Sequence, residues 1–222
     1  VRDPYPGLFA PHDGHCWVSP CDRVAYVQIS KCASTQMLEW CGQQGWSRQC
    51  YSDRPWPRHR RAVVLMRDPW SRWVSGVGQW LHNNGWQWRD LGTQARGVLR
   101  MHLTMDDHTQ PQYRFLLGLP LANITAVDVV PGEATSLELQ RVMRDLGHEC
   151  WLDPDRDRGR NPGVPAEELA QWHRDPAFRG RFHAQYGQDY WLRLYLLGRD
   201  VPGELLAARV PMPGDLPPRH SD

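Results

Sequence analysis

The sequence predicts an α/β domain of three layers, in which helices cover both faces of a central parallel β-sheet. Residues 24–29 and 62–66 are short and mostly apolar runs with β-branched members, as strands covered on both faces require. A segment with helix-type residues follows each run almost at once, and residues 124–130 supply a later core strand. These alternating strand and helix patterns are typical of a parallel sheet flanked by helices.

The chain is expected to form a single domain over residues 1–200. Its length of 222 residues suits one domain with a full hydrophobic core. Residues 1–14, with prolines and glycines, are expected to be an N-terminal arm, and residues 201–222 a proline-rich, peripheral C-terminal tail. The net charge of +1 gives no general attraction to nucleic acid or to anionic membranes. No apolar run approaches the roughly 20 residues needed to cross a bilayer.

The N-terminal elements are predicted to form a hairpin that leads into the core. Residues 16–19 form its first strand, 20–22 its turn, and the strand from Val24 its second arm. A helix from Ser34 ends near Gly42 to Gly45, and residues 47–51 form a short strand. Asp53 follows that strand at its carboxyl end, where ligand sites gather in parallel sheets. Residues 54–61 are basic and proline-broken, and we interpret them as a solvated loop.

Residues 30–35, Ser-Lys-Cys-Ala-Ser-Thr, connect the first core strand to its helix and have the composition of an anion site. The helix N-terminus presents unpaired backbone N–H groups and the positive end of its dipole, beside a lysine and two hydroxyl groups. Lys31 is the only lysine among the 26 lysine and arginine residues of the chain. A compact ammonium group suits this anion loop, where the broad planar guanidinium group of arginine would serve poorly.

A second anion site is predicted where the strand 62–66 ends. Arg67 lies at the end of the strand, Asp68 is suited to cap the next helix, and Pro69 suits its first position. Ser75 lies about two helical turns further on. Because both strands are expected to be parallel, the two anion sites should share one edge of the sheet, which suits a ligand with two separated anionic groups.

At this point the sequence resembles the sulfotransferases that use 3′-phosphoadenosine 5′-phosphosulfate (PAPS), and most closely their carbohydrate sulfotransferase branch. Residues 30–35 look like the 5′-phosphosulfate loop, with Ser30 in place of the usual proline. Arg67-Asp68-Pro69, with Arg72 and Ser75, looks like the 3′-phosphate motif. Residues 107–112 resemble a His-x-x-Pro-Gln element, and residues 186–190 a Tyr-x-x-Asp-Tyr helix. The resemblance covers roughly residues 15–197 and implies a P-loop-like fold.

The resemblance implies that PAPS is the co-substrate and its product, PAP, remains after sulfuryl transfer to a hydroxyl group, with no metal required. Lys31 would stabilise the charge that builds on the oxygen bridging sulfur and phosphorus. The residues expected to contact the nucleotide are Lys31, Cys32, Ala33, Ser34, Thr35, Gln36, Arg67, Ser75, Arg160 and Asn161. Arg160 and Asn161 lie in a charged segment that equally suits a solvated loop.

The general base stays open between two residues. His108 lies in the matched element and has an unperturbed pKa suited to base catalysis near neutral pH. Asp53 has suitable placement at a strand end, although an aspartate that shapes a turn is an equal alternative. Glu39 and His59 are weaker candidates for the base. Glu39 lies on the first helix and equally suits an exposed face, and His59 precedes a strand, which places it at the opposite edge of the sheet.

A carbohydrate acceptor is implied mainly by the resemblance. The residues expected to contact it are Trp80, His82, Trp86, His108 and Gln112. Aromatic and amide groups stack on sugar faces and bind hydroxyl groups, although tryptophans in a chain with 12 of them also serve as packing residues. A small alcohol, a lipid headgroup or a peptide tyrosine stays open as acceptor.

Two other functions stay open. A P-loop kinase or NTPase is disfavoured because the loop lacks the GxxxxGK[ST] spacing. A non-catalytic module that binds PAP or glycan would keep the phosphate ligands without a base.

The six cysteines show no regular spacing, and we interpret them as mostly reduced. A zinc site at His12, His15, Cys16 and Cys21 matches no familiar spacing. We expect a cytoplasmic microbial or viral enzyme, with the Golgi-lumenal domain of a longer anchored protein as the alternative. Asn123-Ile124-Thr125 is a glycosylation sequon that leads into a core strand.

Overall fold

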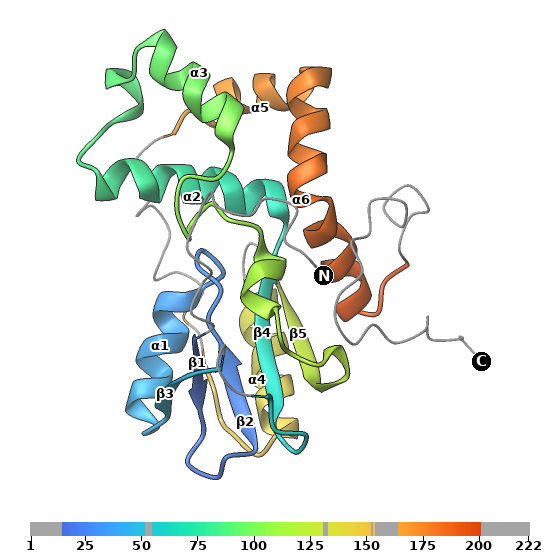
Figure 1. Ribbon diagram of the computed structural model, residues 1–222. Coiled ribbons are helices and arrows are strands. Elements are labelled where there is room, and N and C mark those ends of the chain that lie inside the picture. The colour runs from blue at the N-terminus through green and yellow to red at the C-terminus, as the bar shows by residue number, and fades with distance from the viewer. Residues whose placement is uncertain (1–14, 52–54, 131–132, 152, 154–163, 201–222) are drawn as a thin grey trace.

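A five-stranded sheet with the strand order β3-β1-β2-β4-β5 lies at the centre of the lower half of the molecule in Figure 1. The structure is a computed structural model, and it describes residues 15–51, 55–130, 133–151, 153 and 164–200. The strands are β1 (His15–Val18), β2 (Val24–Val27), β3 (Ser47–Cys50), β4 (Arg61–Arg67) and β5 (Ile124–Val129). Every residue of β2 is buried, as its apolar sequence predicts, whereas β3 is polar, exposed and at the edge.

The sheet is mixed, so the prediction of a parallel central sheet is only partly right. β2, β4 and β5 are parallel neighbours, but β1 runs antiparallel to both β2 and β3. The cause is the short turn after β1, in which Ser19 N donates to Val24 O at 2.9 Å. So short a connection permits only antiparallel pairing, because parallel strands need a long crossover. The predicted hairpin is therefore confirmed, and it is what makes the sheet mixed.

Helices and short 3₁₀ turns follow the strands in the expected order. They are α1 (Ser34–Gln43), α2 (Pro69–Asn83), η1 (Trp88–Asp90), α3 (Thr93–His102), η2 (Gln112–Leu116), η3 (Leu121–Asn123), α4 (Ala134–Asp145), α5 (Ala166–Arg174) and α6 (Pro176–Leu196). In Figure 1, α4 lies behind the sheet and η2 in front of β4. Helices thus flank the sheet, as predicted. No helix in the described ranges is both long and apolar enough to pass through a bilayer.

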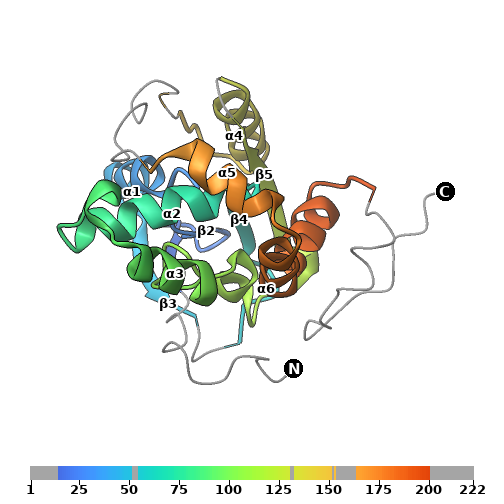
Figure 2. The same cartoon turned by 90° about the horizontal axis from the view of Figure 1, so that it is seen from above.

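The buried apolar side chains form two clusters rather than one core. The first surrounds the sheet and includes side chains of α1, η2, α4 and the second half of α6. The second joins α2, α3, α5 and the first half of α6 above the carboxyl ends of the parallel strands. Figure 2 shows α2 passing over these strand ends, with α3 and α5 on its two sides. The candidate site therefore lies between the sheet and this helical cluster.

Candidate functional site

The loop of residues 30–35 leaves the carboxyl end of β2 and enters α1 through a tight backbone turn. Cys32 N donates to Ile29 O at 3.3 Å, and Lys31 and Ala33 both adopt left-handed backbone conformations, with φ of 66° and 54°. Such conformations cost non-glycine residues roughly 1 kcal/mol or more each. Ala33 caps α1 without any side-chain hydrogen bond. Ala33 thus supplies no side chain to bond the first backbone N–H groups of α1, and free N–H groups at a helix N-terminus suit an anion.

The ammonium group of Lys31 reaches α2, which crosses above the loop. Lys31 Nζ donates to Gln79 Oε1 at 3.0 Å, and Gln79 Nε2 donates to Asn83 Oδ1 at 2.8 Å, one helical turn further on. No local pattern in the sequence marks Gln79, because Lys31 and Gln79 come together only through the packing of α2 on the strand ends. The polar face of α2 is thereby connected to the loop.

Arg67 brings the second predicted anion motif into contact with the first. It ends β4, the parallel neighbour of β2, and its Nη1 lies 3.5 Å from Lys31 O. The juxtaposition of the two loops at one sheet edge follows from this parallel pairing, as the sequence predicts. The predicted helix start is also confirmed, because Pro69 begins α2 and the Asp68 carboxylate accepts a hydrogen bond from Ser71 N at 2.8 Å.

Other parts of the second motif serve the fold. Asp68 caps the N-terminus of α2, unlike Ala33 at the N-terminus of α1, whose side chain makes no capping hydrogen bond. Arg72 is 1 % exposed and donates to the carbonyl oxygens of Ser30, Gln110 and Asp107. Ser75 is buried at 6 % exposure. Arg67 is the half-buried arginine of the motif, whereas Arg72 is fully buried.

Residues 106–110 form a turn, here called the 106–110 turn, that rests against both the loop and α2. Ser30 Oγ donates to Asp107 Oδ2 at 2.9 Å, so the residue that replaces the proline of the resembled motif fixes the loop to this turn. Gly76 permits close packing on the other side, because a Cβ atom there would lie 2.3 Å from His108 O. Asp107 was not predicted as a site residue, although it begins the segment 107–112 that carries the resemblance.

His108 has an environment that disfavours the role of general base. Its Nδ1 lies 3.0 Å from a carboxylate oxygen of Asp106 and 3.0 Å from one of Asp107. Burial lowers the pKa of His108, but the hydrogen bonds to the two carboxylates outweigh burial and raise the pKa to about 9. At neutral pH the imidazole is therefore protonated and cannot accept a proton. The unperturbed pKa assumed from sequence does not hold, because two carboxylates face one ring nitrogen.

Gln112, expected to contact an acceptor, is fully buried and connects the two anion motifs. Its Oε1 accepts hydrogen bonds from Arg67 N at 3.0 Å and from Cys32 Sγ at 3.4 Å, and its Nε2 donates to Arg67 O at 2.8 Å. The buried Asp189 carboxylate accepts from Gln112 N at 2.7 Å and from Tyr113 N at 2.8 Å. We correct the prediction for Gln112, because its position is that of a structural residue.

The other residues predicted to bind the nucleotide or to act as base lie in different parts of the molecule. Ser34, Thr35 and Gln36 lie in the first turn of α1, and Gln36 Nε2 donates to Asp153 O at 3.0 Å. Asp53, Arg160 and Asn161 lie outside the described residues. Glu39 is exposed on α1, which agrees with the alternative to a role as base. His59 contacts Asp22 at 3.2 Å in the β1–β2 turn, at the opposite edge of the sheet, also as predicted.

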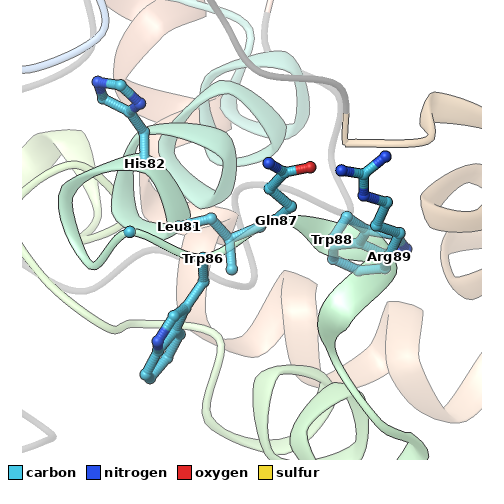
Figure 3. Close-up of a pocket in the computed structure, with 7 residues that line it drawn as sticks. Leu81, His82, Trp86, Gln87, Trp88 and Arg89 are labelled. Atoms are coloured by element: carbon cyan, nitrogen blue, oxygen red, sulfur yellow. The ribbon is translucent and has the colours of Figure 1, made fainter.

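Of the predicted acceptor residues, His82 and Trp86 lie together around one pocket. This pocket, of about 630 Å³, is lined by residues at the end of α2 and in the following turn (Figure 3): Leu81, His82, Gly85, Trp86, Gln87, Trp88 and Arg89. Trp80 does not line the pocket, and its ring packs edge-to-face on Trp86, with ring centroids 5.2 Å apart. His108 and Gln112 are not among the lining residues either, so the five predicted acceptor residues do not form one group.

The described residues offer little support for a resident metal. Within them, the only cluster of three potential ligands is Asp106, Asp107 and His108. Of the zinc alternative, His15, Cys16 and Cys21 form no such cluster there, and His12 lies outside the described residues. All six cysteines are free thiols.

The chain was compared with models of protein families, with curated proteins and with solved structures. None of them matches it. The resemblance to PAPS-dependent sulfotransferases thus rests on the ordered motifs and on the chemistry of the residues around Lys31.

Proposed function

We propose that the protein is a PAPS-dependent O-sulfotransferase that acts on a carbohydrate hydroxyl group. The observation that supports it best is the contact between the two anion motifs, in which Arg67 at the end of β4 reaches the carbonyl oxygen of Lys31. A nucleotide with a reactive 5′-phosphosulfate and a 3′-phosphate carries two anionic groups, so it needs two cationic sites near each other on the protein. The uncapped N-terminus of α1 and the ammonium group of Lys31 suit the reactive end.

In the proposed reaction the acceptor oxygen attacks sulfur while the bond between sulfur and the 5′-phosphate oxygen breaks. Lys31 stabilises the negative charge that develops on that leaving oxygen, and Ser34 and Thr35 bind the phosphate. Arg67 binds the 3′-phosphate, and Arg160 and Asn161 are further nucleotide ligands predicted from sequence. Ser75, which was predicted from sequence to bind the same phosphate, is buried and is not assigned to it. The acceptor proton passes to a carboxylate, for which Asp53 and Asp107 are the candidates, because His108 is already protonated.

A titration of the full chain with nucleotides tests the donor site. PAP is expected to raise the melting temperature more than ATP with Mg²⁺ does, since ATP lacks the 3′-phosphate. The opposite order would favour the P-loop kinase or NTPase alternative and would contradict the proposal.

Transfer itself is tested with labelled PAPS and a panel of glycans. Incorporation of label into a glycan is expected, and it should be lost in Lys31→Ala. The alternative of a non-catalytic module that binds PAP or glycan is supported by one observation. The raised pKa of His108 keeps its imidazole protonated near neutral pH, which removes one of the two predicted bases. PAP binding without transfer to any acceptor, and slow PAPS hydrolysis unchanged by Asp53→Ala and Asp107→Ala, would establish that module instead.

A further inference from the structure

The ammonium group of Lys31 is held by a side-chain amide of α2, and the chemistry of the two groups determines which end of the amide faces it. Lys31 Nζ and Gln79 Oε1 lie 3.0 Å apart, and both side chains are half-buried. An ammonium group carries three donors and no acceptor, so only the carbonyl oxygen of the amide can bond to it. The opposite orientation of the amide would place donor against donor.

Asn83 supports this orientation from one helical turn further along α2. Gln79 Nε2 donates to Asn83 Oδ1 at 2.8 Å. The two residues are four apart, so their side chains are neighbours on one face of the helix. Because Asn83 accepts a hydrogen bond from the NH₂ end of the Gln79 amide, the carbonyl end is directed to Lys31. The hydrogen bonds of the three side chains therefore agree in direction.

The helix that carries Gln79 is fixed over the carboxyl ends of the strands. Figure 2 shows α2 passing over these ends. Gly76 contacts the 106–110 turn, and Val77 is fully buried. A lysine side chain has many rotamers in solution, and a bond to an acceptor on a fixed helix reduces their number. The ammonium group is thus placed before a ligand binds.

The acceptor is also neutral, which suits a site for anions. A glutamate at residue 79 could accept the same hydrogen bond, but it would pair with the charge of Lys31 and repel a phosphate group. Glutamine holds the ammonium group without adding a negative charge beside the loop.

We propose that Gln79 is a positioning residue for Lys31, and that Asn83 orients Gln79. Gln79 holds the ammonium group where negative charge develops on the leaving oxygen, and its neutral amide keeps the positive charge available to the nucleotide. The inference rests on the proposed function and deepens it, since it adds two residues of α2 to the donor site. Their role is to place Lys31 rather than to contact the nucleotide.

NMR of the Lys31 ammonium group tests the contact without any nucleotide. Lys31 is the only lysine of the chain, so protein labelled with ¹⁵N-lysine gives a single side-chain ammonium signal. Gln79→Leu should shift this signal and speed the exchange of its protons with water, because the acceptor is lost. Gln94→Leu, at an exposed position of α3, is the matched control and should leave the signal unchanged. An unchanged signal in Gln79→Leu would overturn the proposal.

Single-turnover transfer from labelled PAPS tests the role in the reaction. Gln79→Leu is expected to lower the transfer rate about 10-fold with PAP affinity unchanged, because the ammonium group is less well placed. Gln79→Glu keeps an acceptor and a protected ammonium signal, but its negative charge is expected to weaken PAP binding about 10-fold. A residue that only stabilises the fold would not separate rate from affinity in this way. Equal PAP affinity in the two variants would contradict the role of the neutral acceptor.

Asn83 allows a test by a conservative variant. Asn83 is exposed, so substitutions there are compatible with the fold. Asn83→Leu removes the acceptor for Gln79 and should lower the transfer rate several-fold, whereas Asn83→Asp retains an acceptor and should keep the native rate. Equal rates in these two variants would exclude Asn83 as the residue that orients Gln79.

The outcomes separate this inference from the proposed function. If Gln79→Leu alters the ammonium signal but the wild type transfers no sulfate, Gln79 positions Lys31 and the sulfotransferase proposal fails. If the wild type transfers sulfate and Gln79→Leu transfers it at the native rate, the donor site holds and the role of Gln79 is excluded.

Discussion

Lys31 shows how backbone conformation and neighbouring residues position a single side chain. Its φ of 66° and the buried strand before it hold the side chain at the carboxyl edge of the sheet, where Gln79 and Arg67 contact it. A left-handed conformation at a non-glycine residue persists only where the surrounding structure stabilises it.

Lys31→Arg is expected to reduce sulfate transfer by about 100-fold while PAP still binds, because a planar guanidinium group replaces the compact ammonium group beside the leaving oxygen. Single-turnover rates with labelled PAPS measure the transfer, and calorimetry measures PAP affinity. A native transfer rate in this variant would show that charge alone suffices and would contradict the role assigned to the shape of Lys31.

His108 is expected to make the stability of the fold depend on pH. Its pKa of about 9 in the folded protein lies above the ordinary value of 6.5, so the protonated form is stabilised by folding. That contribution is complete below about pH 6.5 and is lost as pH rises through about 9. It amounts to at most a few kcal/mol, since one pKa unit corresponds to about 1.4 kcal/mol.

Urea unfolding of the wild type and His108→Gln at about pH 6 and about pH 9.5 measures this effect. The difference in free energy of unfolding between the two proteins should be large at the lower pH and small at the higher. A difference that does not change with pH would mean that the two carboxylates do not hold the proton on His108.

At the scale of elements, the contact between α2 and the 106–110 turn depends on the absence of a side chain at Gly76. Alanine normally favours a helix over glycine by up to about 1 kcal/mol. A Cβ atom at residue 76, however, would lie 2.3 Å from His108 O and 2.8 Å from the carbonyl carbon, and neither backbone atom can rotate away. The steric clash that alanine would create at residue 76 therefore opposes the gain in helix propensity.

Gly76→Ala is expected to destabilise the protein by about 1–3 kcal/mol, measured as a change in the urea midpoint. Gly97→Ala in α3 is the matched control, because nothing lies within 4 Å of its Cβ position. The control should leave stability unchanged or raise it slightly. If both variants behaved alike, the close approach of the turn to α2 would not be a determinant of stability.

At the scale of the whole molecule, α6 holds the site together from the far end of the chain. Tyr186 is fully buried, and its hydroxyl group donates to Leu103 O at 3.1 Å and to Thr109 O. Asp189, one turn later, caps η2. Arg193 forms two hydrogen bonds with Asp128 on β5, both at 2.8 Å. One helix thus joins the 106–110 turn, η2 and the sheet.

Tyr186→Phe is expected to cost about 1–2 kcal/mol of stability, because the carbonyl groups of Leu103 and Thr109 lose a buried donor. Tyr195→Phe serves as control, since within the described residues the Tyr195 hydroxyl makes no hydrogen bond and its ring stacks on Trp191. Thermal unfolding compares the two variants. An equal loss of stability in both would exclude the Tyr186 hydroxyl as a fixed connection to the turn.

The sequence by itself determined the features that depend on neighbouring residues. The buried strand β2, the loop 30–35 and the start of α1 follow from apolar runs and helix-start signals, and Asp68 and Pro69 start α2 through local hydrogen bonding and a fixed φ. The parallel pairing of β2 with β4 then brings Lys31 and Arg67 together, as expected from the order of strands and helices.

Only the tertiary structure decided what depends on residues far apart in the chain. Ser30 meets Asp107 across 77 residues, and Gln112 meets Cys32 across 80, so no local pattern announces either contact. The same packing places two carboxylates beside His108, buries Gln112 and lets Gly76 contact the 106–110 turn. Burial and neighbouring charge set these properties, and both arise when α2 and α6 close over the strand ends.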